Sequence, residues 1–214
     1  MITTEAVDPR RVEALRRNRH TVESYERWAK GYAESVSPEQ SPFGAAALRR
    51  LAGAAGPGGT VLEVGSGPGW DADFVESLGV AVRRTDATGA FRDIQTARGK
   101  QVGHLDLLAD DLGGPYDAVL AMCVLIHIDR ALTDLVLGKV AGALRPDGAF
   151  LVSVREGTGE LWDSGEAAGC HLVFWDRAGF AARLASAGFT VDWDDRHVYG
   201  GDEPWLTFLA RRTR

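Results

Sequence analysis

The sequence is short of cysteine and of long apolar runs, and each shortage excludes a class of protein. Its 214 residues include two cysteines and no C-x-x-C pair, so we expect neither a disulfide framework nor a structural zinc site. No apolar run approaches the length of a membrane span, and the N-terminal MITTEAVDPRR carries charges where a signal peptide needs an apolar core. These observations predict a cytoplasmic protein with no membrane-spanning segment and no bound metal.

The chain also has fewer positively charged than negatively charged residues, with 24 Lys and Arg against 30 Asp and Glu. The formal net charge is −6, which argues against broad attraction to nucleic acid or to an anionic membrane and favours a small-molecule partner. Hydrophobic residues make up 45% of the chain and charged residues 25%, which is the range of ordinary globular proteins. The length fits one domain with a sizeable core, while nothing in the sequence indicates the oligomeric state.

The chain is organised around residues 60–70, TVLEVGSGPGW. The apolar run breaks abruptly into alternating glycines at Gly65, Gly67 and Gly69, which is typical of a buried strand that enters a glycine turn. A residue without a Cβ lets the backbone approach a ligand closely and adopt a positive φ. From Trp70 the sequence has helical periodicity, so the turn leads into a helix N-terminus, which attracts anionic groups.

A second apolar strand ends in Asp86, about twenty residues beyond the turn, where a nucleotide-binding doubly wound sheet places an acid. The two oxygens of a carboxylate suit the two vicinal hydroxyls of a ribose. The glycine spacing is G-x-G-x-G, and Trp70 stands where a dinucleotide-binding fingerprint has its last glycine. This difference disfavours an NAD-dependent or flavin-dependent dehydrogenase but leaves that class open.

Five segments, taken in order, resemble the successive motifs of class I S-adenosylmethionine-dependent methyltransferases of the small-molecule type. They are VLEVGSGPG, the strand-end Asp86, GHLDLL, YDAVLAMCVLIHI and LRPDGAFLVSV. The resemblance runs from about Tyr25 to the C-terminus, and its motifs are specific for the cofactor and poor at naming the substrate. It implies S-adenosylmethionine as cofactor and S-adenosylhomocysteine as product.

The resemblance also implies the fold class. We expect an α/β protein with a Rossmann-like, seven-stranded and mostly parallel sheet, helices on both faces, a C-terminal antiparallel hairpin and extra N-terminal helices. Residues 1–57 are expected to form an N-terminal helical cap, and residues 58–214 the methyltransferase core, within one structural domain overall.

By the same resemblance, the glycine turn binds the methionine and ribose parts of the cofactor. Gly65 and Gly67 are expected to let the backbone approach the methionine moiety. Glu63, on the first strand, is expected to face the ammonium group, directly or through water. Asp86 is expected to hold the ribose hydroxyls.

The adenine and the sulfonium are expected to meet segments further along the chain. In the family pattern Asp106, or the backbone at Leu107, meets the adenine amino group, which needs a hydrogen-bond acceptor. The other interpretation of Asp106 is a helix cap for the segment LLADDLG. Cys123 is expected to offer mainly its backbone beside the sulfonium.

Three aromatic residues lie on one face of the predicted N-terminal helix. Tyr25, Trp28 and Tyr32 are separated by three and four positions. They either dock the helix on the sheet or, as the resemblance of YERWAKGYAE to the aromatic segment of related methyltransferases implies, close over the cofactor. Both roles are compatible, and Tyr32 is also a candidate for the substrate pocket.

His127 is the candidate catalytic residue. It follows the apolar strand that starts at Tyr116, at the crevice where open α/β sheets bind ligands. An imidazole there is placed to take a proton from an attacking hydroxyl or protonated amine. The alternative is a packed or capping histidine, and a neutral amine or an aromatic nitrogen as acceptor needs no base.

The segment REGTGELWDSGEAAGCHLVFW is polar and rich in glycine, and we expect it to be a long loop that serves as a substrate lid. The C-terminal FTVDWDDRHVYG and EPWLTFLARR are expected to form the closing hairpin. Further candidate pocket residues share a position in this loop or at a strand end. They are Arg155, Glu156, Trp162, His171, Tyr199 and Trp205.

The expected function is transfer of a methyl group to an oxygen or nitrogen of a small molecule by in-line SN2 displacement, with specialised metabolism as the expected setting. Three alternatives remain open at this stage. They are a methyltransferase that acts on a peptide, protein or RNA, a cofactor-binding protein without turnover, and an NAD-dependent dehydrogenase.

Overall fold

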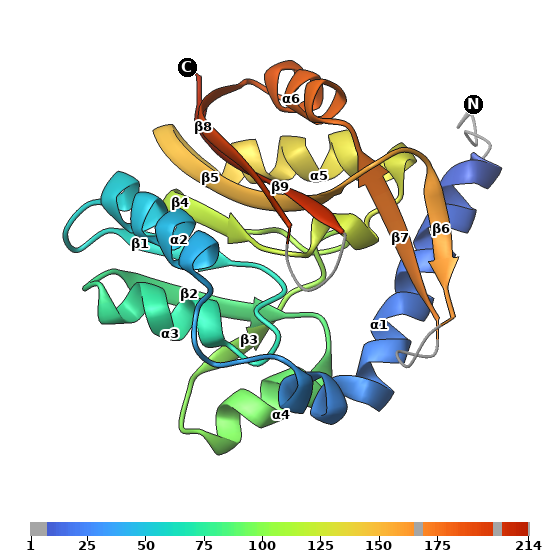
Figure 1. The fold of residues 1–214 in the computed structure, drawn as a ribbon, viewed down its shortest axis with the longest axis horizontal. Coiled ribbons are helices and arrows are strands. Elements are labelled where there is room, and N and C mark those ends of the chain that lie inside the picture. Colours follow the sequence, from blue (N-terminus) through green and yellow to red (C-terminus); the bar gives the residue numbers. More distant parts are fainter. Residues whose placement is uncertain (1–7, 165–168, 199–202, 214) are drawn as a thin grey trace, which may run out of the picture.

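The computed structural model describes residues 8–164, 169–198 and 203–213, and it places helices around a central sheet (Figure 1). The helices are α1 (Pro9–Ser35), α2 (Pro42–Ala55), α3 (Trp70–Ser77), α4 (Gly89–Ala97), the 3-10 turn η1 (Leu125–His127), α5 (Arg130–Ala143) and α6 (Arg177–Ser186). The strands are β1 (Thr60–Glu63), β2 (Ala81–Asp86), β3 (Val102–His104), β4 (Tyr116–Ala121), β5 (Leu144–Glu156), β6 (Glu160–Asp163), β7 (Cys170–Trp175), β8 (Phe189–Val198) and β9 (Pro204–Arg212).

The sheet confirms the expected fold class. Strands β3, β2, β1, β4 and β5 are neighbours in that order and run parallel to one another. β9 pairs antiparallel with β5, and β8 pairs antiparallel with β9. These strands form the expected mostly parallel sheet with its C-terminal hairpin. Because the first five strands are parallel, their carboxyl ends meet at one edge, which is where this kind of sheet binds ligands.

The segment that follows β5 is a β-hairpin, so the expectation of a long polar loop is wrong. β6 pairs antiparallel with β7, and β7 extends the end of β5 through the pair Arg155 and Phe174. Leu172, Val173 and Trp175 are buried in this strand, and their burial offsets the cost of ordering the chain. The glycines and acids of the first half suggested a loop, but the apolar run CHLVFW supplies a strand. Residues 165–168, between β6 and β7, lie outside the described part.

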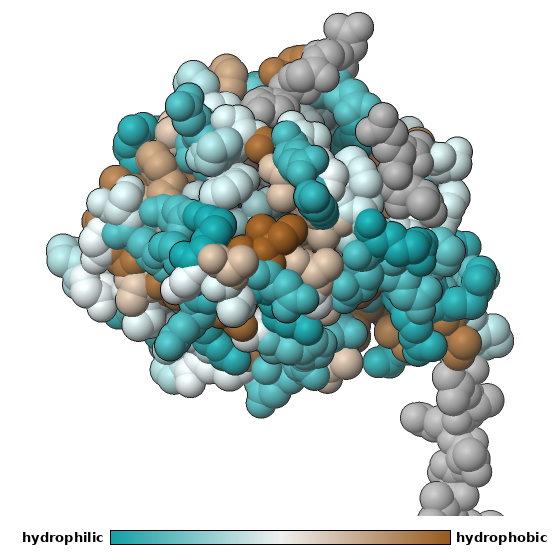
Figure 2. Space-filling view, turned by 90° about the horizontal axis from the view of Figure 1, so that it is seen from below, coloured by the Kyte–Doolittle hydropathy of each residue, from teal (hydrophilic) through white to brown (hydrophobic). Residues whose placement is uncertain are grey.

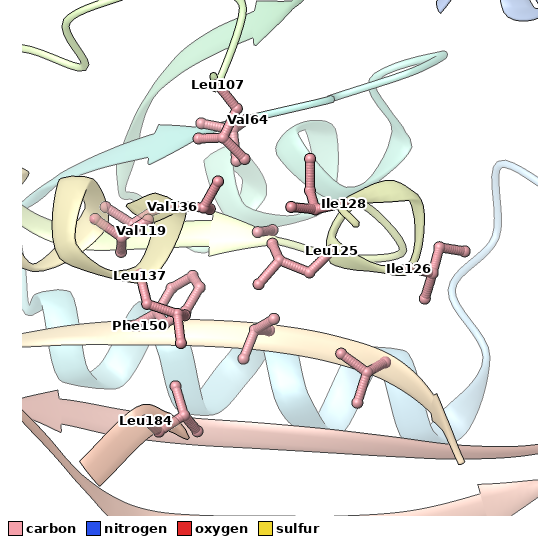
Figure 3. Close-up of a cluster of buried hydrophobic side chains, with 14 of the residues drawn as sticks. Val64, Leu107, Val119, Leu125, Ile126, Ile128, Val136, Leu137, Phe150 and Leu184 are labelled. Carbon is pink, nitrogen blue, oxygen red and sulfur yellow. The ribbon is translucent and has the colours of Figure 1, made fainter. Parts of the chain in front are cut away.

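Two apolar clusters pack helices onto opposite faces of the sheet. The first joins α2 to β1, β4 and β5, and the second joins α5 and α6 to the other face of β4 and β5. Alternate residues of each strand belong to different clusters, as the pleat requires. Figure 3 shows part of the second cluster, including Val119, Val136, Leu137, Phe150 and Leu184.

The outside of the molecule is polar over most of the face seen in Figure 2, where hydrophobic residues form only small patches. Among the described residues, no helix combines the length and the hydropathy that a membrane crossing requires. The apolar side chains are therefore collected mainly in the two clusters beside the sheet.

The predicted N-terminal helix is α1, which is a single continuous helix of 27 residues. Asp8 caps its start, because the Asp8 side chain accepts a hydrogen bond from Arg10 N at 3.0 Å, and Pro9 occupies the first helical position. α1 contacts α4, β7 and α5, and it runs beside the sheet instead of packing on the faces that hold α2, α5 and α6 (Figure 1). It therefore forms a wall at the carboxyl edge of the sheet.

Candidate cofactor and acceptor site

Two adjoining cavities lie at the carboxyl edge of the sheet. The narrower one has a volume of about 140 Å³ and extends toward the end of β2 and the segment after β3. The wider one has a volume of about 510 Å³ and extends toward β5, β8 and β9. A molecule in one cavity can contact a molecule in the other, because the two cavities share part of their lining. The shared residues are Tyr25, Tyr32, Val64, Gly65, Gly67, Met122, Cys123 and His127.

The glycine turn after β1 has the open backbone that its sequence predicted. Gly65, Gly67 and Gly69 have φ values of 63°, 53° and 87°. A Cβ at Gly65 would lie 2.6 Å from a Val124 methyl group, and a Cβ at Gly69 would lie 2.6 Å from Gln95 Oε1. Gly67 differs, because no atom lies within 4 Å of the place of its Cβ. The backbone of Gly67 therefore faces open space in both cavities.

Asp86 holds this turn from the end of β2. Its Oδ2 accepts a hydrogen bond from Gly67 N at 2.8 Å, and its Oδ1 accepts one from Thr88 N at 2.7 Å. Each carboxylate oxygen has two lone pairs, so each can accept a further hydrogen bond from a ligand. Asp86 lines the narrower cavity, and burial raises its pKa. The position fits the role of ribose acceptor that the resemblance implies.

Two carboxyl groups, one buried and one half-buried, line the wider cavity beside the glycine turn. Glu63 is 3% exposed, and its Oε2 has no hydrogen-bond partner within the described protein. Asp71, in the first turn of α3, accepts a hydrogen bond from Gln40 Nε2 at 2.8 Å. Burial raises the pKa of both groups. An ammonium group placed here would pair with the orphaned oxygen of Glu63, so the residues fit the amino-acid end of S-adenosylmethionine.

The narrower cavity is lined by Phe91, Leu105, Asp106 and Leu107 on the side away from β5. Asp106 Oδ1 accepts a hydrogen bond from Leu108 N at 2.8 Å, so the side chain closes a turn as well as facing the cavity. The apolar side chains suit a flat aromatic base, and Asp106 offers a polar edge beside them.

Helix α1 brings its aromatic face to both cavities. Tyr25 and Tyr32 line both of them, and Trp28 lines the wider one. The Tyr25 ring packs with the rings of Tyr32 and Phe91, at centroid distances of 5.8 Å in each case. Glu26, the next residue in sequence after Tyr25, accepts hydrogen bonds from two backbone N–H groups at the start of α4. This contact satisfies free N–H groups at a helix N-terminus and fixes α1 across the site.

His127 lies in the shared wall in one defined tautomer. Its Nδ1 is 2.9 Å from the carbonyl oxygen of His171, which can only accept, so Nδ1 carries the proton. Its Nε2 is 3.1 Å from the Tyr25 hydroxyl, which therefore donates to it. Burial lowers the pKa of His127 to about 4 and raises the pKa of Tyr25. At neutral pH both groups are uncharged, and the basic nitrogen of His127 points at Tyr25.

Cys123 occupies the shared wall with its backbone held in place. It has a φ of 59°, which is unusual for a residue other than glycine, and its N–H donates to Ser153 Oγ at 2.8 Å. Desolvation raises the pKa of the Cys123 and Cys170 thiols to about 11. Both cysteines are therefore neutral thiols at neutral pH, unlike the thiolates that act as nucleophiles.

The predicted substrate residues fall into two groups. Tyr32, Arg155 and Trp205 line the wider cavity. The rest do not line either cavity, or lie outside the described residues. Glu156 pairs with Arg196 at 2.6 Å, and Trp162 is 43% exposed and packs against His20. The Nε2 atom of His171 is 3.2 Å from a Glu160 carboxylate oxygen. Tyr199 lies outside the described residues.

Other residues that line the wider cavity were not predicted from the sequence. Asp71 gave no signal of its own, because acidic residues are common in the first turn of a helix. Thr207 could have been found, because it is a hydroxyl within the apolar strand WLTFLA. Gln40 and His197 reach the cavity from a loop and from β8 without a local signal.

The strand order, the glycine turn after β1 and the acid at the end of β2 define a nucleotide-binding fold of the class I methyltransferase type. The family model described as a methyltransferase domain matches residues 38–192 of this chain. The match spans more than half of the chain, so the protein belongs to this family, as a class I methyltransferase with S-adenosylmethionine as its cofactor.

Solved structures share the fold at low sequence identity. The 1,6-didemethyltoxoflavin-N1-methyltransferase of Burkholderia thailandensis is 22% identical, with a TM-score of 0.71 over 100% of this chain and 94% of that chain. DhpI is 20% identical, with a TM-score of 0.73 over 92% of this chain and 97% of that chain. The [4+2]-cyclase SpnF is 17% identical, with a TM-score of 0.62 over 79% and 80% of the two chains. No curated protein matches the sequence.

Substitution of Gly67 tests the open backbone of the turn. Gly67→Ala and Gly79→Ala both place a Cβ in open space at a positive φ, so each is expected to destabilise the protein by about 1–2 kcal/mol. Only the Cβ at Gly67 enters the cavities, so only Gly67→Ala is expected to weaken binding of S-adenosylhomocysteine, measured by isothermal titration. Equal affinity in the two variants would contradict this assignment of the turn.

His127 is expected to make stability depend on pH. Its folded pKa of about 4 lies below its usual 6.5, so the unfolded chain takes up the proton first as the pH falls. The contribution of His127 to the free energy of unfolding is fully present above about pH 6.5. It falls by about 3 kcal/mol as the pH is lowered to about 4. The measurement is urea unfolding at about pH 7 and about pH 4.5, for the protein and for His127→Gln.

The same comparison separates His127 from the buried carboxyl groups. Glu63, Asp71 and Asp86 have raised pKa values, so they change stability in the opposite direction over acidic pH. Their effect is common to the protein and its His127→Gln variant. Identical pH dependence in both would show that His127 titrates normally.

Proposed function

We propose that the protein transfers the methyl group of S-adenosylmethionine to an oxygen or nitrogen atom of a small molecule, by in-line displacement. One observation carries this proposal, which is the meeting of the two cavities at a shared wall that includes Gly65, Cys123 and His127. A cofactor whose nucleoside lies in the narrower cavity brings its sulfonium to this wall. An acceptor in the wider cavity then approaches the methyl group from the opposite side.

The cofactor supplies an activated methyl group, so the protein has to bind and align rather than activate it. We propose that Asp86 accepts the ribose hydroxyls and that Glu63 pairs with the ammonium group. Asp106 and the backbone at Leu107 meet the adenine. Gly65 and Gly67 leave room for the methionine chain, and Cys123 contributes its backbone beside the sulfonium. Tyr25 and Trp28 of α1 cover the ligand within the proposed cap, whose second helix, α2, packs on the sheet.

The pair formed by Tyr25 and His127 suits an acceptor that loses a proton. The acceptor would give its proton to the Tyr25 oxygen while the Tyr25 proton passes to His127 Nε2, which keeps both protons accounted for. With a pKa of about 4, His127 is a weak base. The pair therefore suits an acidic O–H or N–H, and a nitrogen with a free lone pair needs no base at all.

The size of the wider cavity supports a small-molecule acceptor. Its volume of about 510 Å³ lies within the range of small-molecule sites. The toxoflavin methyltransferase that shares the fold was crystallised with bound 1,6-didemethyltoxoflavin and S-adenosylhomocysteine. By analogy we propose that this protein belongs among the small-molecule methyltransferases of specialised metabolism.

A second candidate function follows from the likeness to SpnF, which is described as a [4+2]-cyclase on the same fold. A protein of this fold can therefore carry out a reaction other than methyl transfer. Such a protein would bind S-adenosylmethionine without consuming it. Release of S-adenosylhomocysteine on incubation with an acceptor panel distinguishes the two functions.

Binding experiments test the cofactor. We expect S-adenosylmethionine and S-adenosylhomocysteine to bind in isothermal titration, and NAD not to bind. Asp86→Asn preserves the shape of the side chain and removes the charge, so it is expected to weaken cofactor binding by about 10- to 100-fold. Asp195→Asn, on β8 and outside both cavities, serves as the control. Binding of NAD alone would support a dehydrogenase instead.

Turnover of an accepted substrate tests the role of His127. If the acceptor loses a proton, His127→Gln is expected to lower kcat by about 10²- to 10⁴-fold while binding of S-adenosylhomocysteine stays within about threefold. Tyr25→Phe is expected to lower kcat as well, because it interrupts the same path. Unchanged turnover in both variants would leave His127 and Tyr25 as residues that only hold α1 in place.

A further inference from the structure

One wall of the wider cavity is a polar face of three adjacent strands. Arg155 of β5, Trp205 of β9 and His197 of β8 stand opposite one another in the ladder, and Thr207 lies two positions along β9. Residues two apart on a strand point to the same face, so all four side chains share it. All four also line the wider cavity. We call Arg155 of β5, together with Trp205 and Thr207 of β9, the β5–β9 patch.

Two atoms of the β5–β9 patch lack hydrogen-bond partners within the described protein. They are Arg155 Nε and Thr207 Oγ1, and both atoms are buried. A terminal nitrogen of Arg155 pairs with Glu203, and the guanidinium lies 5.6 Å from the centre of the Trp205 ring, so the side chain is held while its Nε–H stays free. A buried donor without an acceptor costs about 1–3 kcal/mol, and a ligand that supplies the acceptor recovers this free energy.

The β5–β9 patch lies close to the place where the methyl group is transferred. Ser153 stands opposite Thr207 in the ladder, and Ser153 Oγ accepts the hydrogen bond from Cys123 N at 2.8 Å. Cys123 belongs to the wall shared by the two cavities. The Ser153 side chain therefore lies between the patch and the shared wall. A small molecule can contact the patch and the shared wall at the same time.

Aromatic side chains surround the patch. Trp28 of α1 lines the wider cavity together with Trp205, and His197 stacks on Phe43 at a ring distance of 5.0 Å and an angle of 9°. The carboxyl side chains that line the cavity come from other elements, namely Glu39, Glu63, Asp71 and Asp163, while the Glu203 carboxylate pairs with a terminal nitrogen of Arg155. The patch therefore offers two donors beside the Trp205 ring, which are the Nε–H of a guanidinium already paired with Glu203 and the hydroxyl of Thr207.

We propose that the β5–β9 patch binds a carboxylate group of the methyl acceptor, and that the acceptor is a planar aromatic molecule. One carboxylate oxygen accepts from Arg155 Nε and the carboxylate also accepts from Thr207 Oγ1, while the ring lies between Trp28 and Trp205. A carboxylate is the ligand of choice because hydrogen bonds between a guanidinium and an ionised acceptor are the stronger ones. This inference rests on the proposed function, since it names the substrate class of the same site.

The experiment compares two probes that differ by one carboxylate. Binding of 3-hydroxy-2-naphthoate and of 2-naphthol is measured by fluorescence titration with S-adenosylhomocysteine at saturation. We expect the naphthoate to bind at least about tenfold more tightly. Arg155→Gln is expected to weaken naphthoate binding by about 10- to 100-fold, and Thr207→Val by about three- to tenfold, with naphthol binding unchanged in both.

Arg196→Gln is the matched control, because Arg196 lies on β8, pairs with Glu156 and does not line the cavity. It is expected to bind both probes as the unchanged protein does. Thr207→Val keeps the shape of the side chain, so it tests the patch even if Arg155→Gln fails to fold.

Four outcomes overturn the inference. The first three are equal affinity for the two probes, binding of neither probe, and a preference for the naphthoate that survives Arg155→Gln. A fourth is a loss of S-adenosylhomocysteine affinity in Arg155→Gln with unchanged affinity for methylthioadenosine, because that result assigns Arg155 to the carboxylate of the cofactor. Failure of the proposed function has a separate signature, which is the absence of S-adenosylhomocysteine binding in the unsubstituted protein.

Discussion

The buried guanidinium of Arg84 supports the glycine turn on which the site depends. Its side chain is 1% exposed and donates to the carbonyl of Gly69 at 3.1 Å, while Glu76 and Asp73 neutralise it. Beside it, Gln95 Nε2 donates to Ser66 Oγ at 2.6 Å and to the carbonyl of Gly67 at 2.8 Å. Arg84 and Gln95 therefore satisfy the carbonyl groups of Gly69 and Gly67 on the side of the turn that faces the protein interior. The opposite edge of the turn, including the open backbone of Gly67, is thereby left to the cavities.

The second requirement is the placement of α1, which completes both cavities. Its polar side chains are tied to distant parts of the chain, since Thr21 Oγ1 accepts from His171 N at 3.1 Å and Glu26 caps α4. The same helix carries Tyr25, whose hydroxyl orients His127. The proposed cofactor cover and the candidate base therefore form one unit, and a movement of α1 changes both. The β6–β7 hairpin contributes here through its backbone, because the carbonyl of His171 fixes the tautomer of His127.

Local signals predicted the parts of the fold that depend on neighbours in sequence. The glycines after β1 and Asp86 after β2 were predicted because backbone freedom and strand-end carboxylates follow from residue type. Pairing across the chain was not predictable in the same way. The run CHLVFW forms an edge hairpin only because α1 and β5 are there to cover it. Likewise, the tautomer of His127 depends on His171, and the placement of Arg155 beside Thr207 depends on the pairing of β5 with β9, all more than forty positions apart in sequence.

Charge balance connects these features to the chemistry of the acceptor. The cofactor's sulfonium is positive, and after transfer the sulfur is a neutral thioether. An acceptor that attacks as an anion, or as it loses its proton, removes the positive charge, and opposite charges attract more strongly between aromatic walls than in water. The neutral Tyr25 and His127 pair adds no positive charge beside the sulfonium, whereas a protonated histidine would repel it. A weak base in the shared wall is therefore compatible with methyl transfer, provided that the acidity of the acceptor makes up for the weakness of the base.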